Sequence, residues 1–230
     1  MAETRLQSPL LEMYELFADL PSSVCTDILS TARPRDYMCC QVMFFVGDPI
    51  TETLLLTDGC AKITQHGESG TEVILRLIAP GDVIGELGLA AGSRHSSTAQ
   101  ALQDCKVLVW GAATFEATLE RFPILQRNAE RILVRQLDEL ERRFCEIATE
   151  MASPRLAHAL VRLLHQIGHK VNSHVEINVS QEALAQMTAM TSSTVSRVLT
   201  NWESQGLLRV RREVIEIHSV LHLLGLCKVA

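Results

Sequence analysis

Short apolar runs separated by turn-forming residues fill the chain from residue 36 to residue 110. Glycine, proline and aspartate separate these runs at intervals of about ten to twelve residues, which is typical of antiparallel sandwiches and rolls. A parallel sheet would need a helical segment between successive strands. We therefore expect antiparallel strands at residues 42–46, 53–57, 60–65, 71–78, 83–87 and 105–110.

A long helix with a narrow apolar stripe is predicted to follow. Residues 124–151 contain no proline or glycine, and six apolar residues recur at spacings that alternate between four and three. This heptad pattern is typical of a helix that packs against one partner helix, so we predict a parallel homodimer. A single long core helix is the alternative. The stripe consists of Leu133, Leu137, Leu140, Phe144, Ile147 and Met151.

Other residues of this helix have separate expected roles. Ile132 and Val134 can pack on the strands. Ser153 and Pro154 are expected to break the helix and form a linker, with a new helix over 155–167. The charged residues that flank the stripe are Asp138, Glu139, Glu141, Arg142 and Arg143.

Residues 180–201 have the pattern of a helix-turn-helix that binds DNA. Ser180 and Thr191 stand where N-caps belong, and Ala185 is small enough for two helices to cross closely. Ala189 falls in the turn, where a left-handed backbone makes glycine commoner. An ordinary helical hairpin in a core is the alternative. The expected apolar contacts come from Leu184, Met190, Val195 and Val198.

A two-stranded wing is predicted over 207–210 and 214–217, with two arginines at its turn. A plain surface hairpin is the alternative. Side chains of the second helix and of the wing can reach base edges and phosphates of a major groove. The predicted DNA-binding residues are Ser180, Gln181, Thr191, Ser192, Ser193, Ser196, Arg197, Arg211 and Arg212.

Charge and length agree with a DNA-binding C-terminal part. The 230-residue chain has a formal net charge of −6, but residues 152–230 hold eight Lys and Arg against five Asp and Glu. Phosphate contact depends on local positive charge rather than on the average. We find no signal peptide and no apolar run long enough to cross a membrane, and therefore expect a cytoplasmic protein. Residues 10–17 resemble a short amphipathic helix.

The seven cysteines, Cys25, Cys39, Cys40, Cys60, Cys105, Cys145 and Cys227, show no metal-binding spacing. We expect buried, inert thiols, with a redox or cluster role as the alternative. Hydrolase, metalloprotease and phosphate-loop motifs are absent from the sequence, so we expect no enzyme.

Taken together, segments 47–63 and 80–101, the long helix and the helix-turn-helix with its wing resemble the Crp/Fnr family of transcription regulators. The resemblance implies an α+β fold with an N-terminal antiparallel β-roll of the cyclic-nucleotide-binding type. It implies an effector-sensing domain (1–122), a dimerisation helix (123–152) and a winged helix-turn-helix (153–230). It also implies effector-modulated binding to a pseudo-palindromic promoter and contact with RNA polymerase. A haem- or nucleotide-binding sensor that acts only through protein contacts is the alternative.

The effector follows less directly from the resemblance. Members that bind cyclic AMP hold its phosphate with backbone amides and an arginine followed by a serine, and this arginine is replaced here by His95. Leu140 and Glu141 replace the Thr-Ser pair that reaches the adenine, so cyclic AMP is disfavoured. The effector-site residues that the resemblance implies are Gly85, Glu86, Leu87, Arg94, His95, Ser96, Ser97 and Leu140.

The resemblance also raises two cofactors that occur in the family. No cysteine precedes Cys25, which disfavours an iron–sulfur cluster. Haem would need an axial ligand, for which His66, His95 and the cysteines are candidates. The cofactor therefore stays open between a cyclic nucleotide, haem, another small ligand and none.

The second helix of the motif also departs from many members. Ser192 and Ser193 stand where those members carry a glutamate that accepts a hydrogen bond from cytosine. Ser196 and Arg197 match the Ser-Arg of the Fnr branch, so Arg197 is the best candidate for a guanine or phosphate contact.

Overall fold

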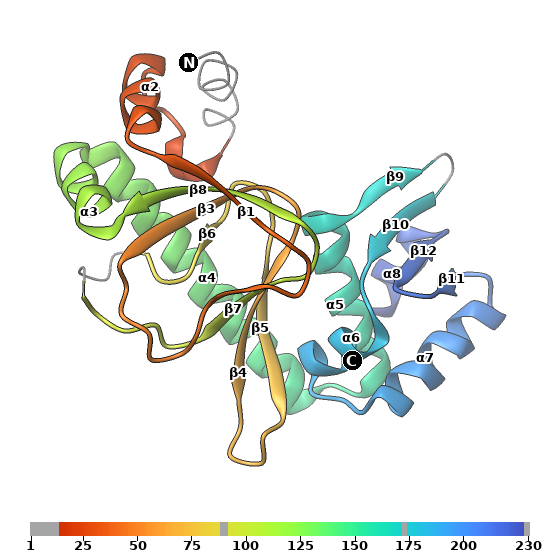
Figure 1. Ribbon diagram of the computed structural model, residues 1–230. Coiled ribbons are helices and arrows are strands. Elements are labelled where there is room, and N and C mark those ends of the chain that lie inside the picture. The colour runs from red at the N-terminus through yellow and green to blue at the C-terminus, as the bar shows by residue number, and fades with distance from the viewer. Residues whose placement is uncertain (1–13, 88–91, 172–173, 228–230) are drawn as a thin grey trace. The chain divides into compact units, whose positions relative to one another are not determined.

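The computed structural model describes residues 14–87, 92–171 and 174–227. The chain forms two compact units (Figure 1). The first unit comprises Met1–Gln65 and Arg76–Glu139, and the second comprises His66–Leu75 and Leu140–Ala230.

Two four-stranded antiparallel sheets form the β-roll, with strand orders β1-β8-β3-β6 and β2-β7-β4-β5. The predicted antiparallel architecture is confirmed. The strands are β1 (Arg33–Tyr37), β2 (Val42–Phe44), β3 (Glu52–Asp58), β4 (Ala61–His66), β5 (Glu72–Ile78), β6 (Val83–Ile84), β7 (Thr98–Ala101) and β8 (Cys105–Gly111).

Two strands lack the apolar pattern that would have predicted them. Strand β1 has four exposed residues out of five and lies at a sheet edge, where Pro34 costs little pairing. Strand β7 is built on small residues, and its buried side chains are Ala99 and Ala101. Strand boundaries also differ from the prediction. Phe45 and Val46 are exposed and lie beyond β2, and β6 ends at Ile84 rather than at residue 87.

The core of the first unit lies between the roll and its helices. These are η1 (Glu15–Phe17, a 3-10 helix), α2 (Ser22–Ser30), α3 (Ala112–Arg121) and the first part of α4 (Pro123–Thr149). Polar groups in this core are hydrogen-bonded, since Trp110 Nε1 donates to Ile28 O at 2.9 Å and Asn128 Nδ2 donates to Ala18 O at 2.8 Å. Of the helix predicted at 10–17, residues 10–13 lie outside the described residues.

Helix α4 confirms the predicted long helix, and its apolar stripe is exposed in the single chain. Phe144 is 71% exposed and Leu137 is 55% exposed. Ile132 packs in the core as expected, whereas Val134 is exposed and the expectation for it was wrong.

The helix break falls earlier than predicted. Helix α4 ends at Thr149, and α5 (Ala152–Ile167) begins after Met151, which is its N-cap. Pro154 therefore lies in the first turn of α5, where the missing N–H of proline has no helical partner to lose. Met151 accordingly is not part of α4, although it was expected to extend the stripe.

The second unit contains the winged helix-turn-helix. Helices α6 (Gln181–Thr188) and α7 (Ser192–Ser204) form the motif, and α8 (Val220–Leu226) follows the wing. A four-stranded antiparallel sheet has the order β11-β12-β10-β9. Its strands are β9 (His169–Val171), β10 (His174–Asn178), β11 (Leu208–Arg211) and β12 (Val214–Ile217). The first wing strand is shifted by one residue from the predicted 207–210.

Local capping explains why the motif forms where the sequence predicted it. Ser180 Oγ accepts a hydrogen bond from Ala183 N at 3.0 Å, and Thr191 Oγ1 accepts one from Thr194 N at 3.2 Å. Ala189 adopts the left-handed conformation in the turn, with φ 51° and ψ 45°. The caps and the turn residue are confirmed, although alanine carries a steric cost that glycine would avoid.

The cysteine prediction is only partly right. Cys25, Cys60 and Cys105 are buried free thiols, and burial raises the pKa of Cys60 to about 12. Cys39, Cys40 and Cys145 are exposed, contrary to expectation. Within the described part of the chain, no helix has the length and apolar character needed to cross a membrane.

We predict that Ala189→Gly raises the free energy of unfolding by about 0.5–1 kcal/mol. Glycine removes the strain of the left-handed backbone at this position, and this gain exceeds the loss that comes from the greater conformational entropy of glycine in the unfolded chain. Urea denaturation followed by circular dichroism measures the change. Ala159→Gly is the control, because Ala159 is buried within α5 and its replacement should destabilise the protein by about 1 kcal/mol or more. Equal destabilisation by both changes would contradict the prediction.

Candidate DNA-binding surface and effector pocket

Helix α7 has one buried face and one polar face. Val195, Leu199 and Trp202 are buried against the rest of the unit. The opposite face carries the residues predicted for base contact: Ser192, Ser193 and Arg197 are exposed, and Ser196 is half-buried. The Thr191 hydroxyl lies 2.9 Å from those of Ser193 and Thr194, so the start of the helix presents a hydroxyl cluster. At α6, the Ser180 hydroxyl already caps the helix and Gln181 is half-buried.

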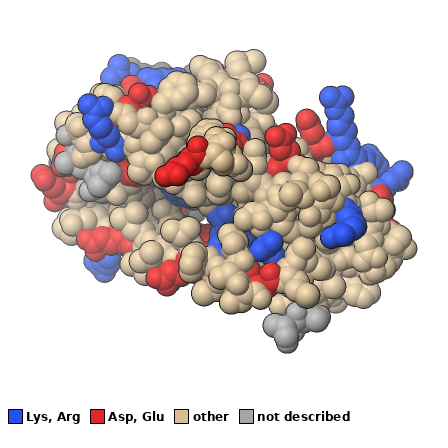
Figure 2. Space-filling view, turned by 90° about the horizontal axis from the view of Figure 1, so that it is seen from below, with Lys and Arg blue, Asp and Glu red and all other residues tan. Residues whose placement is uncertain are grey.

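The wing carries three exposed arginines. Arg209 and Arg211 lie on β11, and Arg212 lies in the turn before β12. Arg211 was expected at the turn, but it is the last residue of the strand, and its Nε contacts the buried carboxylate of Glu216. Arg209 was not predicted. Over the face drawn in Figure 2, Lys and Arg are interspersed with Asp and Glu rather than gathered into one large basic area.

The predicted effector residues of the roll are engaged with one another. Glu86 accepts hydrogen bonds from the backbone N and the Oγ of Ser96, each at 2.7 Å, and from His95 Nδ1 at 2.7 Å. His95 is 6% exposed, and its ring stacks on Phe44 with centroids 3.6 Å apart. Burial raises the pKa of Glu86, but the hydrogen bonds from Ser96 and His95 outweigh it and leave the pKa below its ordinary value.

The remaining predicted residues do not join this network. Arg94 is exposed, and its Nη1 donates to Gly47 O at 2.6 Å. Ser97 is buried, and Leu140 is exposed on α4. Gly85 has φ 101°, and an added Cβ would lie 3.2 Å from the Phe44 ring, so glycine is required by both conformation and space.

One cation near this network was missed from the sequence. Arg76 Nη2 donates to Gly85 O at 2.7 Å. Burial lowers the pKa of Arg76, and the carboxylates of Asp82 and Glu86 offset part of that change. The available signal was a charged residue inside the apolar run of β5, which needs a partner when it is buried.

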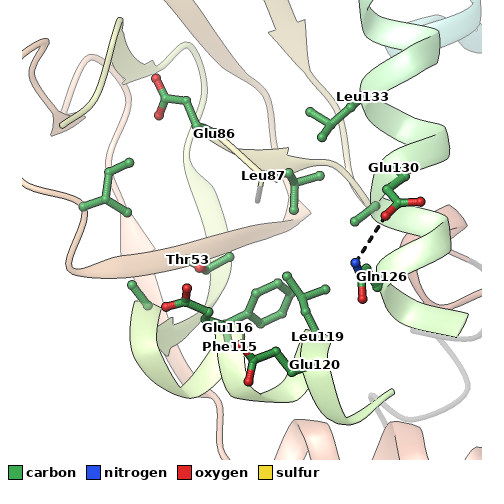
Figure 3. Close-up of a pocket in the computed structure, with 13 residues that line it drawn as sticks. Thr53, Glu86, Leu87, Phe115, Glu116, Leu119, Glu120, Gln126, Glu130 and Leu133 are labelled. Carbon is green, nitrogen blue, oxygen red and sulfur yellow. Dashed lines mark hydrogen bonds between the residues drawn. The ribbon is translucent and has the colours of Figure 1, made fainter. Parts of the chain in front are cut away.

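A pocket of about 350 Å³ lies beside Glu86 and Leu87, between α3, α4 and β3 (Figure 3). Apolar side chains form much of its wall, and Gln126 Nε2 donates to Glu130 Oε1 at 3.3 Å there. Among the described residues, its lining includes four carboxylates and no lysine or arginine. The carboxylates are Glu86, Glu116, Glu120 and Glu130.

Arg143 has a role that the heptad pattern did not indicate. The pattern placed it beside the stripe, but it is only 8% exposed. Its Nη2 donates to Ile74 O at 3.0 Å and to Met187 O at 3.1 Å, and its Nη1 donates to Leu75 O. One guanidinium of α4 therefore binds carbonyls of both β5 and α6, all within the second unit.

A β-roll that carries the predicted effector residues, followed by a helix with an apolar stripe and a winged helix-turn-helix, defines a DNA-binding transcription regulator rather than an enzyme. Comparison with known families agrees. Residues 34–122 match the cyclic nucleotide-binding domain, and residues 154–225 match the Crp-like helix-turn-helix domain, which together cover more than half of the chain. The chain belongs to the Crp/Fnr family, whose helix-turn-helix regulators bind DNA and form dimers.

Individual relatives support this assignment. The cyclic AMP receptor protein of Thermus thermophilus is 27% identical over 190 residues, covering 82% of this chain and 85% of that protein. A CRP-like cAMP-activated global transcriptional regulator of Mycobacterium tuberculosis is 20% identical over 204 residues, covering 88% and 91%. The structure of FixK2 from Bradyrhizobium japonicum shares the fold with a TM-score of 0.76 at 20% identity, covering 86% of this chain and 98% of that chain.

We predict that Glu86→Gln lowers the free energy of unfolding at neutral pH by about 1.5–3 kcal/mol, the usual value of hydrogen bonds to a charged group. The pKa of Glu86 is lowered by folding, so its contribution is present above the unfolded-state pKa and is lost as the pH falls through the folded pKa. The difference between variant and wild type should therefore narrow in acid. Chemical denaturation across a pH series measures it.

Glu120→Gln is the control, because Glu120 is exposed and its replacement should change stability by less than about 0.5 kcal/mol. If the loss in free energy of unfolding caused by Glu86→Gln does not vary with pH, the conclusion that Glu86 is ionised in this network is wrong.

Proposed function

We propose that the protein is a homodimeric transcription regulator that places α7 of each subunit in the major groove of a pseudo-palindromic promoter site. The observation that carries this proposal is the two-faced character of α7, which is capped at Thr191, buried along one side and polar along the other. Exposed hydroxyls and Arg197 can contact base edges, while Arg211 and Arg212 of the wing can contact phosphates. Ser180, Gln181 and Thr191 lie at the starts of the two helices, where backbone N–H groups favour phosphate.

Specificity is expected to depend mainly on Arg197. Serine hydroxyls both donate and accept, so Ser192, Ser193 and Ser196 distinguish bases weakly. An arginine can form two parallel hydrogen bonds with a guanine. The target site is therefore expected to differ from that of relatives with a glutamate at these positions.

We predict that Arg197→Ala weakens binding to the selected DNA site by about 1–3 kcal/mol, because a bidentate guanine contact is lost. Fluorescence anisotropy measures the affinity on a site selected from genomic fragments and on a scrambled duplex. Arg33→Ala is the control, because Arg33 is an exposed arginine on β1 of the β-roll. Equal weakening on both duplexes would show that Arg197 contacts phosphate only, and unchanged affinity would refute its role.

The dimer is proposed to form along α4. Leu133, Leu137, Leu140, Phe144 and Ile147 are all exposed in the single chain. Their heptad spacing matches one partner helix, and pairing would remove the stripe from water. A two-fold pair of α7 helices then matches two half-sites of a palindrome.

We predict that Leu140→Asp converts the dimer to a monomer and abolishes specific DNA binding, because it places a carboxylate in the middle of the apolar seam. Sedimentation velocity measures the mass, and gel shift measures binding. Arg142→Asp is the control, since Arg142 is exposed and lies on another side of α4 from the stripe. A Leu140→Asp monomer that keeps wild-type operator affinity would overturn the proposal.

The effector is proposed to be a neutral or cationic, largely apolar molecule in the pocket of Figure 3. Its four carboxylates would repel a phosphate. In the cassette, the expected arginine is missing, Arg94 is held by Gly47, and Glu86 is already occupied by Ser96 and His95. These contacts disfavour cyclic AMP, and the stacking of His95 on Phe44 disfavours it as a haem ligand. Native mass spectrometry tests this: bound cyclic nucleotide or haem would refute it.

Helix α4 is proposed to transmit the effector signal as a population shift. Its Leu133 lines the pocket, and its Arg143 donates a hydrogen bond to the carbonyl oxygen of Met187 near the end of α6. A ligand that favours one position of α4 would therefore bias the position of the helix-turn-helix. We further propose that the DNA-bound dimer contacts RNA polymerase and acts in the cytoplasm, and in vitro transcription tests the polymerase contact.

A further inference from the structure

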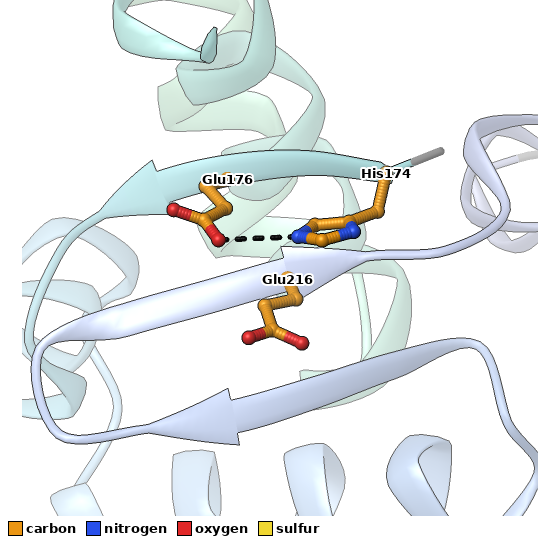
Figure 4. A group of neighbouring side chains, drawn as sticks. All are labelled: His174, Glu176 and Glu216. Atoms are coloured by element: carbon orange, nitrogen blue, oxygen red, sulfur yellow. Dashed lines mark hydrogen bonds and ion pairs between the residues drawn. The ribbon is translucent and has the colours of Figure 1, made fainter. Parts of the chain in front are cut away.

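Histidines and glutamates gather on one face of the sheet in the second unit. In the antiparallel register, Glu176 of β10 pairs directly with Glu216 of β12 and with His169 of β9. His174 lies two residues before Glu176 on the same side of β10, as the alternation of side chains requires. The side chains of His174, Glu176 and Glu216 come together from these neighbouring strands (Figure 4).

Two carboxylates directly opposite each other on neighbouring strands repel, so this pair needs a nearby cation. A nearby positive charge matters most for Glu216, which is only 3% exposed, because a buried carboxylate is stable only next to an opposite charge or hydrogen-bond donors. Its Oε1 contacts Arg211 Nε but makes no hydrogen bond of acceptable geometry with any residue that the structure describes. Its Oε2 lies 3.8 Å from His218 Nε2.

The geometry suits a metal ion. His174 Nε2 lies 3.1 Å from Glu176 Oε1, and one ligand atom from each of His174, Glu176 and Glu216 lies within 4.8 Å of the others. Ligand atoms around a tetrahedral zinc ion are about 3.4 Å apart. A small rotation of one carboxylate side chain would therefore bring the three ligand atoms to the spacing that a bound ion requires. His169 Nε2, at 3.6 Å from Glu176 Oε2, and His218 are near enough to orient the carboxylates or complete the coordination.

We propose that His174, Glu176 and Glu216 bind a divalent late transition-metal ion of the zinc type. Imidazole combined with carboxylates favours such an ion over magnesium or calcium, which prefer oxygen ligands throughout. The ion adds positive charge between the two facing carboxylates, beside the charge that Arg211 brings to Glu216. It also competes with Arg211 for Glu216, so the wing arginine is released from this contact when metal binds.

The test uses the full chain with Cys39→Ser and Cys40→Ser, because these exposed thiols lie 3.6 Å apart and could themselves bind a soft metal. Cobalt(II) is titrated as a spectroscopic probe, and zinc is measured by competition with a chromophoric chelator. We expect one ion per chain, cobalt absorption without a thiolate charge-transfer band, and displacement of cobalt by zinc. No binding, or a spectrum dominated by thiolate, would overturn the proposal.

Variants locate the site. His174→Ala should weaken metal binding by at least about tenfold, because even residues that only orient metal ligands have effects of this size. Glu216→Gln should do the same, provided that circular dichroism shows it folded. Arg211→Ala should leave affinity unchanged or increase it, since a competing cation is removed.

His66→Ala is the matched control, because His66 Nε2 also lies 3.8 Å from a carboxylate, that of Glu72, but outside this cluster. It should leave metal affinity unchanged. Wild-type affinity in His174→Ala would refute the site. These measurements contain no DNA, so their outcome is independent of the proposed promoter binding.

Discussion

The exposed apolar stripe of α4 is the feature on which the rest of the molecule depends. Five large side chains along one helix are between 39% and 71% exposed in the single chain, and covering this apolar surface with a partner helix would stabilise a dimer. The family forms dimers, and we propose this stripe as the surface along which two chains pair. Pairing there would define a two-fold axis that relates two α7 helices, one for each half-site.

The predicted effector residues of the β-roll contact one another in this chain. The ring of His95 stacks on Phe44, and its Nδ1 lies 2.7 Å from Glu86 Oε2. The carboxylate of Glu86 therefore has hydrogen-bond partners within the protein, and Ser96 Oγ also donates to it. A neighbouring pocket lined by four carboxylates offers space for a ligand without a phosphate. Members of the family can therefore differ in the ligand that they bind while they share the β-roll, the long helix and the winged helix-turn-helix.

Buried polar groups connect the parts of the second unit. Arg143 joins α4 to β5 and α6 through hydrogen bonds to three carbonyl groups. In the wing sheet, the Nε of the exposed Arg211 contacts the buried carboxylate of Glu216. Burying the Arg143 guanidinium or the Glu216 carboxylate without a partner would be strongly destabilising. Their partners therefore limit which arrangements of the unit are stable.

The sequence by itself determined the features that depend on local chemistry: the long helix, the N-caps Ser180 and Thr191, the turn at Ala189 and the antiparallel strands with apolar cores. It could not predict β1 and β7, because edge pairing and small buried residues leave no apolar period. It placed Arg143 beside the stripe and the helix break at Pro154, since heptad position and proline are local signals. Only the tertiary structure decided that Arg143 is buried, that Arg76 reaches Gly85, and that Glu176 faces Glu216. These contacts join residues from separate elements, and strand register and packing, which no short segment specifies, bring them together.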